Sequence, residues 1–264
     1  MFIRVNRKAA CLFLAICLLA ATVYGYRVWA GHERPIHVQR SWTAPGTDLP
    51  MFYVTTPHRQ IALTFDISWG TQMLPLVLPV LAEHHVKSTF FLSGPWSERH
   101  PELVRSIVQA GHEIASHGHK HDNLSRYDRE YIAANISTAH NILKNLSGQT
   151  PRFFRPPNGD YDDLVVATAR ELGYETVIWA VDSLDWKNPG VEFMVDRVLK
   201  QSFRGAIVLF HASDSCKQTH LALPQVITRL KEAGYSLVTL GDLLRGGTPA
   251  RDDPRGRKIP PVTD

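Results

Sequence analysis

The sequence predicts an α/β fold, a distorted (β/α)7-type barrel that forms a single domain. Apolar runs of strand length alternate with longer amphipathic segments over most of the chain, which is the order expected of parallel strands joined by helices. About seven such units occur, and their repeated right-handed crossovers favour closure into a barrel. The 264 residues, of which 44% are hydrophobic, are enough for one large α/β core.

Strands are predicted where short apolar runs end in a polar residue or a turn. They cover residues 61–66, 88–92, 113–116, 153–155, 176–181, 206–211 and 237–240. Amphipathic spacing predicts the helices at residues 74–85, 101–110, 129–146, 163–172, 191–201 and 221–233, and a short turn at 242–244. Gly111, Gly173 and Gly234 directly follow three of these helices, where glycine readily takes the left-handed backbone that ends a helix.

The first residues predict a targeting segment. Residues 1–30 carry Arg4, Arg7 and Lys8 before an uncharged stretch at 9–26, which is typical of a signal peptide or an N-terminal membrane anchor. Because a basic flank stays in the cytoplasm, the rest of the chain is expected outside it, either membrane-anchored or secreted.

The predicted barrel domain covers residues 59–245. Before it, residues 31–58 are polar, contain several prolines and lack a helical or strand period, as in a stalk or linker. After it, residues 246–264 are rich in proline, glycine and charge and predict a disordered tail.

Charge and cysteine content exclude some classes of function. The net charge of +4 is small, and Lys and Arg are scattered without the clustered basic face of a nucleic-acid site. The sequence therefore predicts no nucleic-acid partner. Cys11 and Cys17 fall in the uncharged N-terminal stretch, which leaves Cys216 as a lone thiol without a disulfide partner or a visible nucleophilic arrangement.

Polar side chains follow five of the predicted strands, at Asp66, His117, Arg155, Asp182 and His211. An aspartate in such a place often only caps the next helix. Five strands that end in this way are hard to explain by capping alone, and the carboxyl ends of barrel strands carry the chemistry in enzymes of this architecture. We therefore expect an active site at this end of the barrel, with Asp66 as its main working group.

The segment Ser-His-Gly-His-Lys-His at 116–121 contains a metal-ligand spacing. If the segment is helical, His117 and His121 share one face within reach of one ion, and His119 points elsewhere. Histidine-rich loops also occur as ordinary solvated segments. The position of this segment directly after a predicted strand favours the metal site.

The segment Phe-Phe-Arg-Pro-Pro-Asn-Gly at 153–159 ends a strand in a rigid Pro-Pro corner. The backbone N–H of Asn158, directly after the second proline, is left free and fixed, which suits binding of an oxyanion. Arg155 would either be solvated in an ordinary turn or lie beside Asp66 and keep that carboxylate ionised and oriented.

His211 ends another apolar strand. A carboxylate close to it would raise the pKa of the imidazole and make it a competent acid at neutral pH. The segment Asp-Ser-Leu-Asp-Trp at 182–186 offers Asp182 and Asp185. Trp186 would be either a core residue or a wall for an acyl methyl group or a sugar face.

In this order, the five segments resemble the polysaccharide deacetylases of carbohydrate esterase family 4, which share the NodB homology domain. The blocks of that family are Thr-Phe-Asp-Asp-Gly, His-x-x-x-His, Arg-Pro-Pro-Tyr-Gly, Asp-Ser-x-Asp-Trp and Leu-x-His, and they are similar here to residues 64–68, 117–121, 155–159, 182–186 and 209–211. The resemblance covers roughly residues 60–244.

This resemblance implies metal-assisted hydrolysis of N-acetyl groups on a glycan. Asp66 would be the general base and His211 the general acid, and Arg155 would position Asp66. Asp185, or less favourably Asp182, would tune His211.

The resemblance also implies how metal and substrate are held. His117 and His121 would bind a divalent metal ion, Zn²⁺ or a similar one. Trp186 would line the acetyl pocket, and the N–H of Asn158 would face the oxyanion. The set is chemically coherent, because a metal polarises water and the amide carbonyl while a base and an acid transfer protons.

One position departs from the family pattern. The second Asp of the first block, which serves the family as third metal ligand, is replaced by Ile67, which binds no metal. Asp-Ile-Ser-Trp-Gly is similar to a sporulation-associated, deacetylase-like subgroup. Protein zinc centres normally use at least three side chains, so the third ligand stays open between Asp66, Asp122 and, if its turn is not helical, His119.

The sequence thus predicts an extracytoplasmic, metal-dependent hydrolase that removes N-acetyl groups from a cell-wall glycan, with peptidoglycan amino sugars as the expected substrate. Its expected partners are this glycan and, through the N-terminal segment, the membrane. Two alternatives stay open. One is a catalytically impaired glycan-binding or regulatory protein that has lost its metal, and the other is a hydrolase of another non-peptide C–N bond, such as a small amide.

Overall fold

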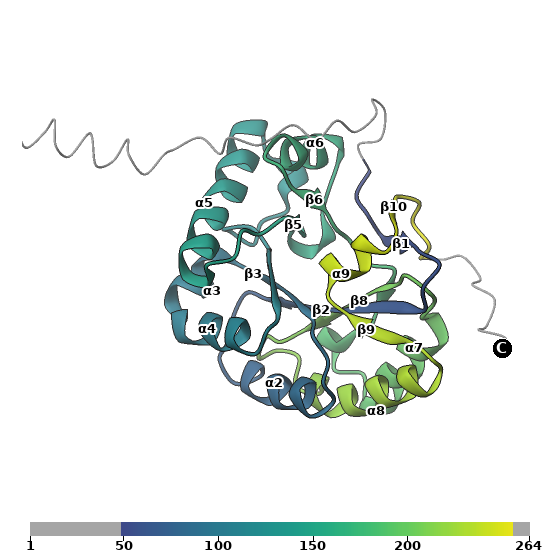
Figure 1. The fold of residues 1–264 in the computed structure, drawn as a ribbon. Helices are drawn as coiled ribbons and strands as arrows, with labels where there is room; N and C mark the ends of the chain where they lie inside the picture. Colours follow the sequence, from purple (N-terminus) through teal and green to yellow (C-terminus); the bar gives the residue numbers. More distant parts are fainter. Residues whose placement is uncertain (1–48, 256–264) are drawn as a thin grey trace, which may run out of the picture. The chain divides into compact units, whose positions relative to one another are not determined.

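A parallel β-sheet forms the centre of residues 49–255, the part of the chain that the computed structural model describes (Figure 1). Its strands follow the order β6-β5-β4-β3-β2-β8-β7, and β9 also pairs with β2. All these pairs are parallel, so the carboxyl ends of the strands lie at one edge. The bounds are Gln60–Ile67 for β2, Thr89–Leu92 for β3, Glu113–Ser116 for β4, Phe153–Phe154 for β5, Glu175–Thr176 for β6, Val181–Asp182 for β7, Ile207–His211 for β8 and Ser236–Val238 for β9. The curled sheet confirms the predicted (β/α)7-type barrel.

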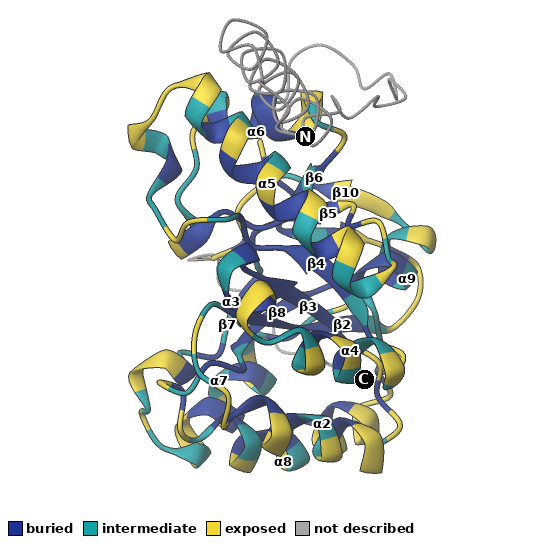
Figure 2. Ribbon diagram, turned by 90° about the vertical axis from the view of Figure 1, so that its left-hand side faces the viewer, coloured by how far each residue is buried: buried dark blue, intermediate teal, exposed yellow. Residues whose placement is uncertain are grey.

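Helices cover the outer side of the sheet. Their bounds are Leu74–Glu83 for α2, Gly94–Arg99 for α3, Pro101–Gln109 for α4, Arg129–Ser147 for α5, Asp163–Glu171 for α6, Val191–Gln201 for α7, Thr219–Glu232 for α8 and Leu240–Arg245 for α9. Short 3-10 turns follow at Leu124–Arg126 (η1), Pro157–Gly159 (η2) and Asp185–Lys187 (η3). In Figure 2 the strands β2, β3, β4 and β8 are buried, while the helices expose residues on their outward faces.

Strand β2 separates the apolar core from the site. Phe65 and Ile67 are buried in the apolar cluster formed by the sheet and helices such as α2 and α8. Thr64 and Asp66 alternate with them, and both contact Arg155 instead. Because successive side chains of a strand point to opposite faces, Ile67 belongs to the outer core rather than to the barrel mouth.

The predicted strand at 176–181 is wrong in part, because two short strands, β6 and β7, replace it. Between them the chain changes neighbours: the N–H of Val177 donates to a carbonyl of β5, whereas that of Ala180 donates to β8. The guanidinium of Arg155 takes two of the carbonyls in between, at 3.4 Å from Val177 O and 3.2 Å from Ile178 O. An arginine side chain therefore fills the gap where, among the described residues, no strand pairing joins β6 to β7.

Both ends of the domain extend beyond the predicted boundaries. Strand β1 (Tyr53–Thr55) lies within the predicted stalk, strand β10 (Thr248–Ala250) lies within the predicted disordered tail, and the two pair antiparallel. Arg251, directly after β10, donates hydrogen bonds to Leu49 O and to the carboxylate of Glu175, which further stabilises this end of the domain. The sequence hides this pairing because each strand is only three residues long and β10 contains a proline, which is typical of edges.

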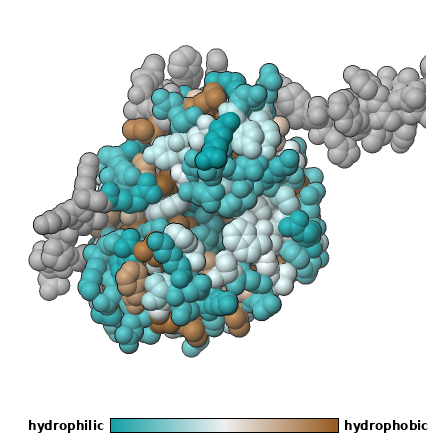
Figure 3. Space-filling view, turned by 180° about the vertical axis from the view of Figure 1, so that it is seen from behind, coloured by the Kyte–Doolittle hydropathy of each residue, from teal (hydrophilic) through white to brown (hydrophobic). Residues whose placement is uncertain are grey.

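The face of the molecule shown in Figure 3 is mixed in polarity. On the side shown in Figure 3, hydrophobic residues form small separate groups within a largely hydrophilic surface. No helix within residues 49–255 is both long and apolar enough to cross a membrane. The predicted targeting segment at residues 1–30 lies outside the described residues.

Candidate active site

A buried ion pair lies at the mouth of the barrel. Arg155, directly after β5, donates through Nη1 to Asp66 Oδ1 at 2.7 Å and through Nη2 to Thr64 Oγ1 at 3.0 Å. Its guanidinium also packs on the ring of Phe91, 4.0 Å from the centroid. Both charged side chains are buried. Strands β2 and β5 thus present a carboxylate that is held in one orientation.

The partners of Asp66 determine its charge. Burial would raise the pKa of this carboxyl group, but the positive charge of Arg155, with contributions from His117 and His211, lowers the pKa below its ordinary value. Asp66 is therefore ionised at neutral pH.

His117 turns one ring nitrogen towards this carboxylate. Its Nδ1–H donates to Arg155 O at 2.8 Å, which leaves Nε2 at 3.8 Å from Asp66 Oδ2. Burial lowers the pKa of His117 to about 4, although the charge of Asp66 opposes this. The imidazole is therefore neutral at pH 7, and the lone pair of Nε2 is available to a metal ion.

His121 lies beside His117, with the ring centroids 5.3 Å apart. The helix on which the spacing argument depended is absent: residues 117–123 form a loop, and Gly118 has a left-handed backbone with φ of 74°. The loop nevertheless brings the two predicted ligands together.

The two alternative ligands point elsewhere. The Nδ1 atom of His119 lies against Gly94, where an added Cβ would come within 2.8 Å of it, on the side facing α5. The carboxylate of Asp122 accepts a hydrogen bond from the hydroxyl of Tyr131. Neither His119 nor Asp122 lines the pocket described below.

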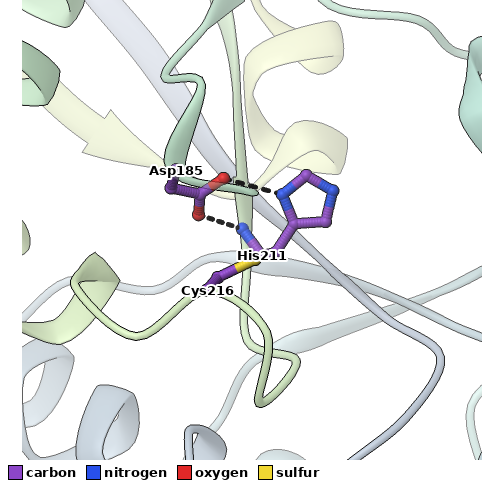
Figure 4. Close-up of side chains that lie close together, drawn as sticks. All are labelled: Asp185, His211 and Cys216. Carbon is purple, nitrogen blue, oxygen red and sulfur yellow. Dashed lines mark hydrogen bonds and ion pairs between the residues drawn. The ribbon is translucent and has the colours of Figure 1, made fainter. Parts of the chain in front are cut away.

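On the other side of β2, His211 ends β8 and is held by Asp185 (Figure 4). The Nδ1–H of His211 donates to Asp185 Oδ1 at 2.8 Å, and its backbone N–H donates to Oδ2 at 2.7 Å. The hydroxyl of Thr219 donates to the same Oδ2 at 2.8 Å. Of the two aspartates left open by the sequence, Asp185 is thus the one in contact, whereas Asp182 accepts the N–H of Leu184 at 2.8 Å.

These contacts determine the charge of His211. Burial would lower its pKa, but the charge and hydrogen bond of Asp185, with the charges of Asp66 and Asp182, raise the pKa above its ordinary value. The imidazole therefore keeps its second proton further into the neutral range, and Nε2 is the atom that can donate it.

Cys216 lies next to this pair, and Asp185, His211 and Cys216 bring one metal-ligating atom each within 4.8 Å of one another (Figure 4). Hydrogen bonds already use His211 Nδ1 and both oxygens of Asp185. Burial raises the pKa of Cys216 to about 12, so its sulfur is a thiol at neutral pH. The cluster therefore suits the positioning of His211 better than metal binding.

A pocket of about 400 Å³ joins the two sides of the mouth. Its lining includes six of the predicted site residues: Asp66, His117, His121, Asn158, Trp186 and His211. The other two, Arg155 and Asp185, are fully buried behind it. Asn158 has a left-handed backbone with φ of 60°, and its side-chain amide donates to Asn123 Oδ1 at 2.7 Å. All eight predicted residues therefore lie in or directly behind one pocket.

Sequence reasoning missed several residues of this pocket. Ser68 and Trp69 line it, and both follow β2 directly, so the rule that identified Asp66 also reaches them. Ser213 lines it as well, and Thr219 holds Asp185. No sequence pattern identifies Ser213 or Thr219, because their roles depend on which loops the fold brings together.

The chemical types of the donor atoms around His117 suit a divalent metal ion. Neutral imidazole nitrogens and carboxylate oxygens are common zinc ligands, and Asp66 Oδ2 faces His117 Nε2. Ile67 cannot be a ligand, because its side chain is a hydrocarbon, and it packs in the outer core with 0% of its surface exposed. Among the three open candidates for the third ligand, only Asp66 lies beside His117 and lines the pocket.

Known proteins with similar sequences decide the family. The family model described as polysaccharide deacetylase matches residues 53–177. The peptidoglycan-N-acetylglucosamine deacetylase of Bacillus cereus is 37% identical over 203 residues, which cover 74% of this chain and 95% of that protein. The chain belongs to the polysaccharide deacetylase family. Members of this family generally depend on a divalent metal ion.

Two further relatives of this polysaccharide deacetylase are informative. The uncharacterized protein YlxY of Bacillus subtilis is 31% identical over 195 residues, and the match covers 74% of this chain but only 60% of YlxY. The solved structure of a CE4 family pseudoenzyme from Bacillus anthracis has a TM-score of 0.71 and 33% identity, and the match covers 75% of this chain and 69% of that one. The polysaccharide deacetylase fold thus occurs both in deacetylases and in a protein described as a pseudoenzyme.

Proposed function

We propose that this chain is a metal-dependent hydrolase that removes N-acetyl groups from the amino sugars of a cell-wall glycan, with peptidoglycan as the substrate. One observation carries the proposal: Asp66 and His211 lie on neighbouring strands and line the same pocket. Asp66 is an ionised carboxylate, and His211 is an imidazole that can donate a proton. The similarity to the peptidoglycan deacetylase of Bacillus cereus supports the substrate class.

Proton transfer on both sides of the amide explains the reaction. Asp66, oriented by Arg155, accepts a proton from water as the water oxygen bonds to the acetyl carbon. The C–N bond breaks as His211 Nε2 gives its proton to the leaving nitrogen, which yields acetate and the free amine. The N–H of Asn158 faces the oxyanion, and Trp186 packs against the acetyl methyl group.

His117, His121 and Asp66 Oδ2 would hold the divalent metal ion, with Zn²⁺ as the expected metal. When bound, such an ion polarises the amide carbonyl and makes water a better nucleophile. Because burial keeps His117 neutral, its Nε2 binds a cation without first losing a proton.

Acetate release tests this function. The full-length protein is expected to release acetate from peptidoglycan and from N-acetylglucosamine oligomers, a chelator is expected to stop the release, and added Zn²⁺ to restore it. His117→Ala and His121→Ala are expected to lower the bound zinc in a metal-content measurement, whereas His119→Ala serves as a control because its ring faces α5. Release that a chelator does not affect would contradict the metal, and no release with any metal would contradict the hydrolase.

Asp185→Asn is expected to move the alkaline limb of the pH–rate profile to lower pH. His211 must be protonated to act, so activity is lost as the pH rises through its pKa. Burial lowers that pKa and the charge of Asp185 raises it, so without this charge the effect of burial prevails. Thr219→Val keeps the carboxylate and is expected to give a smaller shift. An alkaline limb that stays in place in Asp185→Asn would contradict the role of His211 as acid.

A second candidate function is glycan binding without turnover. Two observations favour it: the pseudoenzyme from Bacillus anthracis has the same fold, and Ile67 supplies no metal ligand. In that case the full-length protein would bind N-acetylglucosamine oligomers in a calorimetric titration but release no acetate with any metal.

We propose that the protein acts outside the cytoplasm, where peptidoglycan lies, either membrane-anchored or secreted. The predicted targeting segment at residues 1–30 supports this location. Fractionation of cells that express the full chain would test it.

A further inference from the structure

Trp69 is an exposed indole in the wall of the pocket. It keeps 44% of its surface exposed, whereas Trp96 is fully buried in the core. It lines the same pocket as Asp66 and His211. Single exposed hydrophobic residues are common on protein surfaces, so exposure alone gives it no role. The way in which the ring is held is more informative.

Two contacts fix the orientation of this ring. Its Nε1–H donates to Ser215 Oγ at 3.2 Å, and its plane packs edge-on against His121, with the centroids 5.6 Å apart at 73°. A side chain held by two contacts has less rotational freedom to lose when a ligand binds, so binding to its face costs less entropy.

The loop that carries Trp69 is held by residues 213–215, which we call the 213–215 clasp. Asp214 of the clasp accepts three successive backbone N–H groups, at residues 71–73, at distances of 2.8 to 3.0 Å. Gly70 permits this approach, because a Cβ at that position would lie 2.2 Å from Asp214 Cγ. The first serine of the clasp accepts the N–H of Ser68 at 3.2 Å.

Trp186 is a second exposed indole of the pocket, and the neighbouring residue Asn188 is hydrogen-bonded to the same clasp. Trp186 lies in η3 and is 49% exposed. Asn188 donates through Nδ2 to Ser215 O at 2.8 Å and accepts the N–H of Lys217 through Oδ1 at 2.7 Å. The loops that carry the two indoles are thus both hydrogen-bonded to the clasp, which closely follows His211 in the chain.

Hydroxyl groups accompany the indoles in the pocket lining, at Ser68, Ser213 and Ser215. The hydroxyl of Ser68 is buried and has no hydrogen-bond partner within residues 49–255. Buried hydroxyls normally have a partner, and because this oxygen has almost no accessible surface, a ligand would reach it only after the Ser68 side chain rotates towards the pocket. Aromatic faces beside hydroxyls match a pyranose ring, which has C–H groups on its faces and hydroxyls around its edge.

We propose that Trp69 is a binding platform for a pyranose ring next to the sugar that loses its acetyl group. This inference rests on the proposed function and adds a specificity to it. The protein would prefer an N-acetylated chain over a single N-acetylated sugar, because only a chain occupies both the reacting position and the face of Trp69.

Binding to the full-length protein tests the platform separately from turnover. NMR titration with N-acetylglucosamine and with its tetramer gives the two affinities, and kcat/KM for acetate release is measured in parallel. Trp69→Ala is expected to weaken tetramer binding by about tenfold, the size of one lost ring-stacking contact, and to leave monomer binding unchanged. Trp69→Phe, which keeps an aromatic face, is expected to recover most of the loss.

Phe193→Ala is the matched control, because Phe193 is an aromatic residue of similar exposure, 48%, that lies on α7 and does not line the pocket. Should Trp69→Ala fail to fold, Ser215→Ala removes the anchor of the indole and is expected to give a smaller loss of tetramer binding. Tetramer affinity equal to wild type in the folded Trp69 or Ser215 variant would overturn the platform.

The platform and the proposed hydrolysis fail in different ways. Tetramer binding that depends on Trp69, in a protein that releases no acetate, would support the platform and contradict the hydrolase. If wild type and Trp69→Ala released acetate with equal kcat/KM and bound the tetramer with equal affinity, the hydrolase would be supported and the platform contradicted. A wild-type protein that binds no tetramer but releases acetate from peptidoglycan would overturn the platform and leave the proposed hydrolysis standing.

Discussion

Replacing Asp66 by asparagine is expected to lower the rate of acetate release by about 1,000-fold, because it removes the proposed general base and weakens one of the three proposed metal ligands. Asparagine has nearly the same shape and its oxygen still accepts the hydrogen bond from Arg155, but it takes no proton from water. The measurement is kcat for acetate release from N-acetylglucosamine oligomers at neutral pH.

Asp122→Asn is the matched control for this experiment. It makes the same carboxylate-to-amide change on the neighbouring loop, where Asp122 bonds Tyr131 and does not line the pocket. Its rate is expected to stay near that of wild type. If Asp66→Asn kept the rate of the control, Asp66 would not be the base.

Arg155→Ala is expected to lower the free energy of unfolding by about 3–5 kcal/mol, because it leaves the buried charge of Asp66 without its partner. For a domain of this size the melting temperature would fall by about 10 °C. Since the pKa of Asp66 in the folded protein lies below its ordinary value, the stability from this pair is present above the ordinary carboxyl pKa and is lost as the pH falls through the lowered value.

Arg129→Ala provides the comparison, because Arg129 forms an exposed ion pair with Glu171. Arg129→Ala is expected to lower the free energy of unfolding by less than about 1 kcal/mol. The double variant of Arg155→Ala with Asp66→Ala is expected to recover part of the stability, because no unpaired buried charge remains. A melting temperature for Arg155→Ala equal to that of Arg129→Ala would contradict the role of the buried pair.

Parallel strand pairing alone explains where the structure places three of the predicted site residues. Asp66, His117 and His211 each end or directly follow a buried strand, and parallel pairing brings strand ends together whatever their distance in the chain. The choice between Asp182 and Asp185 could not be made in this way. Leu184 between them has a left-handed backbone, with φ of 59°, which is unusual for a leucine and has no sequence signal.

Interactions between loops and between the two ends of the domain could not be predicted. The partners of the 213–215 clasp lie in other loops, and no local pattern names them. Helix α3 is missing from the prediction because Gly94 and Pro95 at its start are typical of a turn. The break between β6 and β7 depends on Arg155, whose guanidinium takes carbonyls that a continuous strand would use.

The antiparallel pair of β1 and β10 determines when folding can be completed. Tyr53–Thr55 leaves the ribosome well before Thr248–Ala250, so the first strand waits for its partner while the barrel strands between them are made. The loss of chain entropy opposes so distant a contact until the barrel between them has formed. A chain cut before Thr248 would therefore keep the barrel strands but leave the edge of β1 open to pairing with other molecules, and we expect it to aggregate.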